Sequence, residues 1–451
     1  MEFRIAVLPC RRTGAESLHT RWAAVRALAG LLAALLSLAP ARAAPLTLEE
    51  ALATADAPHP QNRIAAADLA MARADETLAA SRSDLTVNFS GVLGSGRPTL
   101  GPDRWTADNE GRLTLSKPLY DFGRTAHRVD AARAEVTARQ EQLLGVRDQR
   151  RIAIMARFFD VLLADMRYTA DNEYLAVAYV NRGNGRKRFE AGELSRAELA
   201  RLEGRYQEIR LRRDGDERQE RLTRERLADA MNQPGKLATD LARPKLADNA
   251  IGLPSYERLL PVTLVHNHSL LALDAQVNAA RQRIAAVRAE GNPRVDLEVA
   301  GGDFSRRTVS RNYASGGLVV TWPLYSGREI DARVARARAE EEKLLAEREA
   351  LRRSVADALL DTLTEIAWLR ASALPAAHQA GQYRDLALER ARAEYDMEYR
   401  TNLGNAMADI QTVSLQRAEL EYRLALALAR LAALTGQPLA ALAAMPEGDT
   451  P

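Results

Sequence analysis

The sequence predicts a mainly α-helical protein with a small β part, built as two tandem repeats of long coiled-coil α-hairpins plus β-hairpins. One observation is a duplication: residues 116–120 (SKPLY) and 321–325 (TWPLY) lie 205 positions apart, and each segment precedes a long helical pattern. A second is that apolar residues recur every three or four positions, which is typical of coiled coils. A third is that this period changes to two in four short segments, as in strands.

The duplication extends through both copies. The motif Arg-Ala-Glu recurs at 133–135 and 338–340, and the copies end alike at 232–234 (NQP) and 436–438 (GQP). Each copy is therefore expected to be one structural unit that packs against its twin. This division gives a first repeat at 44–235, a linker at 236–253, a second repeat at 254–438 and a C-terminal tail at 439–451.

Residues 1–43 have the features of a secretory signal peptide: an arginine-rich start, an apolar core at 27–39 and a small-x-small site at 41–43. A transmembrane helix is the alternative, but it needs about 20 apolar residues. The segment holds six Arg and two Glu, so its removal changes the formal charge from +3 to −1. A nucleic-acid partner is then not expected. The segment also contains the one cysteine, Cys10.

Long helices account for most of the remaining chain, in which charged residues are frequent and aromatic residues are few (27% and 5% of the whole sequence). Residues 124–189 allow helix almost without a break, which corresponds to about 100 Å at 1.5 Å per residue. Residues 327–395 form a similar stretch, in which Pro375 is expected to introduce a kink. The glycine-rich segment 183–186 is expected to be a flexible point or kink in the first stretch.

Four segments alternate polar and apolar residues and are predicted to be strands. They lie at about 84–94 and 111–118 in the first repeat, and at about 294–304 and 316–323 in the second. One interpretation is a sheet with one face on a soluble core. The other is the wall of a barrel with lipid outside and water inside. Four strands cannot close a barrel that admits water, so the second interpretation requires several chains.

The repeated segments 118–124 (PLYDFGR) and 322–328 (WPLYSGR) resemble the strand-to-helix signature of TolC-type outer membrane efflux proteins. The helix endings at 227–234 and 431–438 resemble the closing motifs of the same family. The resemblance covers about residues 46–438. It implies a homotrimer in which each chain gives four strands to a 12-stranded β-barrel, continued by an α-helical barrel that extends into the periplasm.

Four residues are expected to shape the junctions between strand and helix. Pro118 and Pro323 suit the last position of a strand, because proline fixes φ and cannot donate a ladder hydrogen bond. Gly123 and Gly327 permit the local turn that follows.

The first helical turn is expected at about 189–195. Gly192 can adopt a positive φ, and Ser195 is a good N-cap residue. The plain interpretation is a well-capped helix-turn-helix; the resemblance adds docking of an adaptor through Gly192, Leu194 and Ser195. A run of basic residues precedes the turn, and it is either a solvated helix face or a basic collar.

The second turn, at about 395–404, departs from the family pattern because Glu398 replaces a glycine. Thr401 and Leu403 are expected to contribute to adaptor docking, and Arg400 is the gate candidate. The family's gating aspartates correspond to Gly404 and Met407 here, with Asp409 displaced nearby, so the sequence leaves open whether an anionic gate ring exists.

No enzyme motif, cofactor site or metal site is predicted. His266 and His268 lack the spacing of ligands on one helix face. The predicted function is a passive exit duct in the outer membrane that extends into the periplasm. The resemblance implies a periplasmic adaptor (membrane fusion) protein, an inner-membrane pump of RND or ABC type, and contact with outer membrane lipid. Drugs, metals and polypeptides all remain possible cargo. The alternative is a periplasmic coiled-coil scaffold or adaptor-like protein without channel activity.

Overall fold

The computed structural model describes residues 45–97, 104–236, 240–305, 312–397 and 402–444, nearly all within one compact unit that begins at Thr47. The expected signal peptide, Arg400 and Thr401 lie outside the described residues. The helical elements of the first repeat are α2 (Leu48–Ala53), η1 (Thr54–Asp56), α3 (Pro60–Ala80), η2 (Ser81–Ser83), α4 (Arg124–Glu190) and α5 (Arg196–Ala230). Those that follow are η3 (Ala247–Ala250), α6 (Tyr256–His266), α7 (His268–Arg288), η4 (Ala289–Gly291), α8 (Glu329–Trp368), η5 (Leu369–Ala373), α9 (Leu374–Asp396), α10 (Leu403–Thr435) and α11 (Leu439–Ala443).

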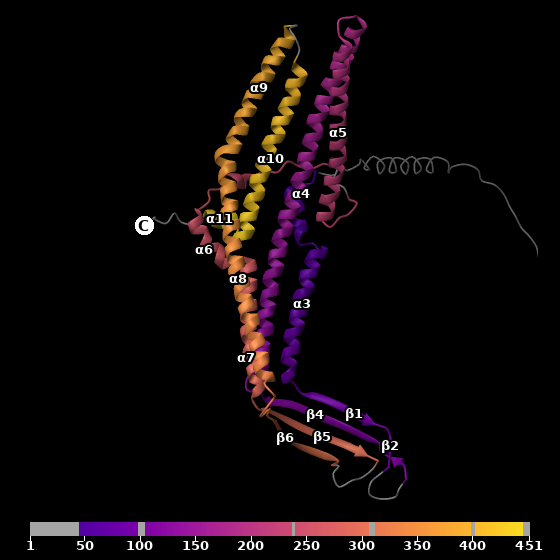
Figure 1. The fold of residues 1–451 in the computed structure, drawn as a ribbon, viewed down its shortest axis with the longest axis vertical. Helices are drawn as coiled ribbons and strands as arrows, with labels where there is room; N and C mark the ends of the chain where they lie inside the picture. Colours follow the sequence, from indigo (N-terminus) through magenta and orange to yellow (C-terminus); the bar gives the residue numbers. More distant parts are fainter. Residues whose placement is uncertain (1–44, 98–103, 237–239, 306–311, 398–401, 445–451) are drawn as a thin grey trace, which may run out of the picture. The chain divides into compact units, whose positions relative to one another are not determined.

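The two repeats have the same helical plan. In the first, α4 packs against α3 along one part of its length and against α5 along another. In the second, α7 packs against α8, and α9 packs against α10. Figure 1 shows these helices running side by side, with α4 spanning the height of the bundle. With 67 residues, α4 is about 100 Å long.

The second repeat divides its long helix with a π-helical turn. The turn η5 comes directly before α9, and Pro375 is the second residue of α9. Proline cannot donate to the carbonyl one turn earlier, so a wider turn there accommodates the missing hydrogen bond. The expected irregularity is thus a π turn that lies N-terminal to the proline.

The segment 183–186 does not interrupt its helix, which corrects the expectation of a flexible point or kink. Gly185 is buried, and a Cβ atom at this position would lie only 2.4 Å from Cδ1 of Leu202 on α5. Glycine here allows α5 to approach α4 closely, whereas Gly183 has no atom near its missing side chain.

The strands form a four-stranded antiparallel sheet in the order β1-β4-β5-β6. Their bounds are β1 (Thr86–Val92), β4 (Glu110–Tyr120), β5 (Arg294–Phe304) and β6 (Ala314–Thr321). A short ladder between β2 (Ser95–Gly96) and β3 (Thr106–Ala107) extends the first hairpin. The pairing of β4 with β5 joins the two repeats.

The core lies where the helices of both repeats meet near mid-length of α4. A cluster of fully buried side chains joins α6, α8, α10 and α11 and includes Leu259, Leu359, Leu428 and Leu442. The ring of Phe159 on α4 stacks on Tyr422 of α10 with centroids 4.4 Å apart, which ties the first repeat to the second. The segment expected as a tail therefore begins with a helix that is part of the core.

None of the helices in the described part of the chain combines the length and the apolar character needed to cross a bilayer.

Candidate functional site

The junctions between sheet and helix repeat the same backbone geometry. Two successive residues have positive φ in each repeat: Phe122 and Gly123 (55° and 84°) and Gly327 and Arg328 (63° and 69°). These pairs are 205 positions apart, as the duplicated motifs are. Glycine occupies the second position in one repeat and the first in the other, so each junction also places a larger residue in a region that favours glycine.

The two prolines do not occupy equivalent ends of strands. Pro118 lies inside β4, at an irregularity in its pairing with β5, and pairing with β1 already ends at Ser116. Its missing donor therefore costs no hydrogen bond on the β1 side. Pro323 lies two residues beyond the end of β6. The expectation that each proline would be the last residue of its strand is wrong at both positions.

One carboxylate holds the bases of the two repeats together. Glu290, in η4, accepts contacts from Arg128 of α4 at 2.6 Å and Arg333 of α8 at 2.9 Å, with Arg124 at 3.4 Å. Its side chain is largely buried, so this ion cluster is less screened than a surface pair. Asp121 also supports the junction, because its Oδ2 accepts the backbone N–H of Thr125 at 2.8 Å and caps α4.

The first helical turn is shaped by local capping. Gly192 has a φ of 76°, and the N–H of Glu193 donates to the carbonyl of Arg188 at the end of α4. Ser195 and Glu198 form a capping box at the start of α5. The Ser195 N–H and hydroxyl lower the pKa of Glu198. Leu194 is half-buried, and its Cδ2 atom would lie 3.6 Å from a Cβ atom at Gly185.

At the second turn, the described residues end at Met397 and resume at Asn402. Tyr395 is exposed, Leu403 is half-buried and Met407 is exposed. Gly404 lies against α4, because a Cβ atom there would be 2.7 Å from Cγ2 of Val177. These positions carry no acidic side chain.

Asp409, the acid that lies nearby in sequence, joins three helices. Its Oδ1 accepts a hydrogen bond from the Tyr174 hydroxyl of α4 at 2.7 Å. Its Oδ2 lies 2.6 Å from Nη1 of Arg384 on α9. The Thr412 hydroxyl donates to the Tyr174 oxygen at 3.3 Å. Burial is the main cause that raises the pKa of Tyr174. This polar clamp ties α4, α9 and α10 together.

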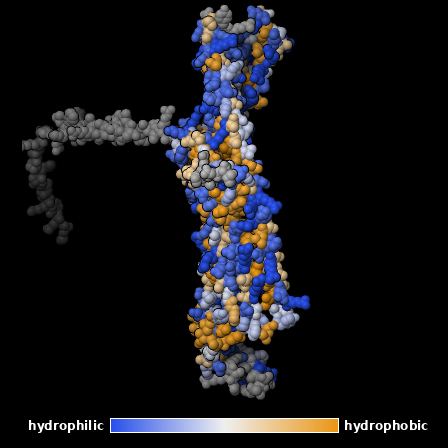
Figure 2. Space-filling view, turned by 90° about the vertical axis from the view of Figure 1, so that its left-hand side faces the viewer, coloured by the Kyte–Doolittle hydropathy of each residue, from blue (hydrophilic) through white to orange (hydrophobic). Residues whose placement is uncertain are grey.

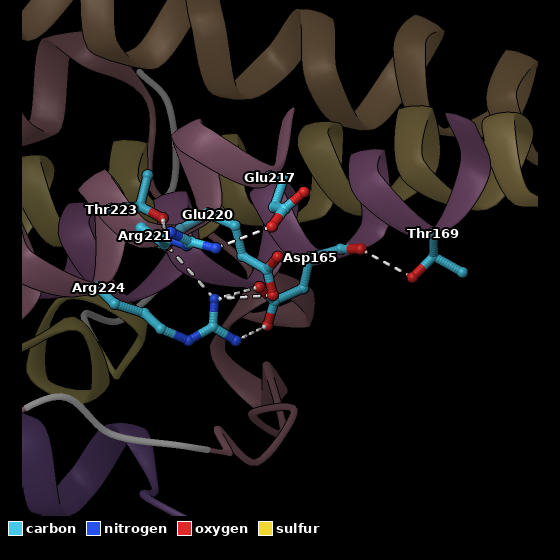
Figure 3. A network of polar contacts seen from close by, with 7 residues as sticks. All are labelled: Asp165, Thr169, Glu217, Glu220, Arg221, Thr223 and Arg224. Carbon is cyan, nitrogen blue, oxygen red and sulfur yellow. Dashed lines mark hydrogen bonds and ion pairs between the residues drawn. The ribbon is translucent and has the colours of Figure 1, made fainter. Parts of the chain in front are cut away.

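A second clamp joins α4 to α5 (Figure 3). The Arg224 guanidinium binds both oxygens of Asp165, at 2.8 and 2.9 Å, and contacts Glu220 at 3.1 Å. The bidentate geometry makes this contact directional. Burial raises the pKa of Glu220, while Arg224 lowers it and Asp165 raises it. Further toward the turn, burial and then the neighbouring Asp171 raise the pKa of Asp216.

The basic run before the first turn is largely engaged within the chain. Arg182 stacks over the rings of Tyr179 and Tyr206, at 5.3 and 4.3 Å from their centroids. Arg186 and Arg188 contact Glu190 and Glu193 at 3.4 and 3.6 Å. These contacts favour the solvated helix face over a collar of free positive charge.

The two neighbouring histidines point to different partners. Nδ1 of His266 contacts the carbonyl of Val262, whereas Nδ1 of His268 lies 2.7 Å from Glu141 of α4. Among the described residues, no three His, Cys, Asp or Glu side chains are grouped so that they could hold a metal ion. The polar contacts near the two helical turns thus act as clamps between helices.

Family comparison matches residues 259–437 to the outer membrane efflux proteins. The chain carries an outer membrane efflux protein domain. This domain covers the second repeat, and no curated protein sequence matches the chain.

Solved structures extend the likeness in fold to both repeats of the chain. The outer membrane protein VceC from Vibrio cholerae is 19% identical, with 87% of this chain and 96% of VceC covered and a TM-score of 0.68. The CmeC outer membrane channel of Campylobacter jejuni is 13% identical, with 86% and 85% covered and a TM-score of 0.70. The open state of the MtrE outer membrane channel of Neisseria gonorrhoeae is 16% identical, with 87% and 89% covered and a TM-score of 0.69. At these identities the likeness establishes the fold.

Proposed function

We propose that this efflux protein is a passive exit duct in the outer membrane that extends into the periplasm. It would work with a periplasmic adaptor and an inner-membrane pump of RND or ABC type. The observation that carries the proposal is that the apolar face of the sheet is exposed and is not covered by the helices.

The register of the sheet places apolar side chains together. Val87 pairs with Leu115, Leu115 with Val299, and Leu297 with Leu318. Large side chains of this face are exposed: Val87, Phe89, Leu113, Leu297, Val299, Leu318 and Val320. Figure 2 shows apolar side chains gathered at the strand-bearing end of the unit. An exposed apolar sheet face of this kind is expected to contact lipid or another protein.

The opposite face is mostly polar. Thr86, Asn88, Thr114, Ser116 and Glu298 alternate along the strands with the apolar set. Apolar residues facing outward and polar residues facing inward are the pattern of a membrane-spanning strand around a water-filled lumen. This alternation supports lipid on one side of the sheet and water on the other.

Closure of the sheet requires other copies. The outer edges of β1 and β6 have no strand partner within the described sheet, and unpaired edges are not stable in a bilayer. A homotrimer would supply 12 strands, and the long helices would continue the wall as an α-helical barrel. In this proposal the two turns face the periplasm, dock the adaptor through Gly192, Leu194, Ser195, Thr401 and Leu403, and gate the duct, with Arg400 as the gate candidate.

The test combines membrane fractionation with conductance in planar bilayers. The wild-type chain is expected in the outer membrane as a heat-resistant oligomer that forms water-filled channels. Phe89→Arg places a charge on the proposed lipid face, which costs about 2–4 kcal/mol near the midplane of a bilayer. It should block assembly, whereas Asn88→Arg, on the opposite face of the same strand, should assemble. Recovery of soluble rods that tolerate both variants equally would instead support a periplasmic scaffold.

A further inference from the structure

A large cavity opens beside the π-helical turn, away from the helical turns and the sheet. Its volume is about 890 Å³, and its walls come from α4, from the linker before α6, from η5 and α9, and from α10. None of the expected docking or junction residues lines it. A π turn inserts an extra residue and redirects the side chains around it, and such turns are frequent at functional sites.

The cavity carries more positive than negative charge. Arg243 of the linker, Arg370 of η5 and Arg417 of α10 line it, and Glu421 is the one carboxylate among its lining residues that the structure describes. Glu421 is already engaged, because its Oε1 lies 2.8 Å from Nε of Arg417. Within the described part of the chain, Arg243 and Arg370 therefore have no carboxylate partner.

Of these two arginines, Arg370 has the more unusual environment. Its Nε and Nη2 atoms are buried and lack a hydrogen-bond partner. Burial lowers the pKa of Arg370, although an arginine stays protonated near neutral pH. Arg370 as a whole is half-buried, and a partly buried charge without a counter-charge destabilises the fold unless another group supplies the missing interaction.

Apolar groups lie next to these charges. Met166, Leu374 and the buried ring of Tyr422 form part of the wall. Arg243 lies close enough to Tyr422 to act on its pKa, which it lowers against the dominant raising effect of burial. The amide oxygen of Asn249, another lining residue, is also buried without a partner. The cavity thus offers positive charge beside an apolar wall.

We propose that this cavity binds a small organic anion, a carboxylate or phosphate ester with an apolar group, held between Arg243 and Arg370. The apolar group would contact Met166 and Leu374. The site is separate from the proposed duct function, and its occupancy can be measured whether or not the chain conducts.

Calorimetric titration of the full chain with phenyl phosphate tests the proposal. Inorganic phosphate supplies the charge alone and phenol the ring alone, so phenyl phosphate should bind at least tenfold more tightly than either. Arg370→Met and Arg243→Met should each weaken binding of phenyl phosphate about tenfold or more. Arg390→Met is the matched control, because Arg390 is an exposed arginine of α9 that pairs with Glu394; it should bind as the wild type does.

Thermal unfolding separates a binding site from a merely structural arginine. Arg370→Met removes a half-buried charge that has two buried, unpartnered nitrogens, so its Tm without ligand should be higher than that of the wild type. Phenyl phosphate should raise the Tm of the wild type more than that of Arg370→Met at the same ligand concentration. Equal binding by the wild type and both cavity variants, or no binding by the wild type, would overturn the proposal. A lower Tm for Arg370→Met together with no binding by the wild type would also overturn the proposal, because Arg370 would then have a structural role only.

Discussion

The Tyr174 hydroxyl donates a 2.7 Å hydrogen bond to Oδ1 of Asp409, which joins the long helix of the first repeat to the last long helix of the second. Arg384 binds the other oxygen of the same carboxylate. Both halves of the chain are therefore fastened at one acid, and the helical turn of the second repeat cannot move away from α4 without breaking these contacts.

Loss of the hydroxyl should weaken this clamp. Tyr174→Phe is expected to lower the free energy of unfolding by about 1 kcal/mol, because the lost bond is to a charged group that is partly exposed. Tyr168→Phe is the control, since Tyr168 lies on the same helix, its ring contacts Arg213, and its hydroxyl has no hydrogen-bond partner among the residues that the structure describes. If the duct proposal holds, Asp409→Ala should also raise single-channel conductance. Equal stability of the two phenylalanine variants would contradict the clamp.

Two glycines in long helices should respond oppositely to alanine. Gly404→Ala brings a methyl group to 2.7 Å from Val177, a stiff β-branched side chain, and should destabilise by about 1–3 kcal/mol. Gly183→Ala has open space and should stabilise by about 0.5–1 kcal/mol through helix propensity. Chemical denaturation measures both values. Combining Gly404→Ala with Val177→Ala should recover part of the loss, and failure to do so would exclude the contact as its cause.

The end of α10 depends on a glycine for two reasons. Gly436 has a φ of 63°, and a Cβ atom there would lie 2.3 Å from the backbone oxygen of His266. Gly436→Ala should cost more than about 2 kcal/mol, since backbone strain and a contact with backbone add together. Gly235→Ala shares the positive φ without a neighbouring atom, so it should cost about 1–2 kcal/mol. Similar Tm losses in the two variants would show that the contact with His266 is relieved.

Asp216 should make stability depend on pH. Burial and the adjacent Asp171 raise the pKa of Asp216, so the folded chain binds its proton more tightly than the unfolded chain does. Stability should therefore fall as pH rises from the ordinary Asp pKa, about 3.9, through the raised value. Asp216→Asn should raise the Tm at pH 7, and this gain should vanish below about pH 3.9. Asp214→Asn, which removes only ion pairs with Arg210 and Arg213, should not raise the Tm at pH 7.

The sequence is sufficient to predict those elements that depend on neighbouring residues in the chain. The capping residues Gly192 and Ser195 placed the first turn, and the change of period placed the strands within a few residues of their ends. No single residue in the sequence indicates the polar clamps between helices. They follow only from antiparallel packing, in which Asp165 and Arg224 meet because both are nearly equally far from Leu194.

Other features depend on contacts between segments far apart in the sequence, and the sequence alone does not predict them. The expectation that Gly185 loosens its helix is wrong, because Leu202 of α5 packs against the position where a side chain would be. The pairing of β4 with β5 joins strands from different repeats, which neither repeat indicates by itself. In the sequence, the arginines of the cavity resemble those of any solvated helix face. Their grouping depends on the π turn and the linker, which line the same cavity only in the folded chain.

The strand count of one chain has a consequence for how copies can meet. Because β1, β4, β5 and β6 alternate in direction, β1 and β6 point in opposite directions at the two edges of the sheet. The last strand of one copy can thus lie antiparallel to the first strand of the next, as neighbours do within the chain. In a head-to-tail ring of any number of copies, every junction between copies is then antiparallel. Strand direction therefore does not fix the number of copies, which depends on the curvature of the sheet and the packing of the helices.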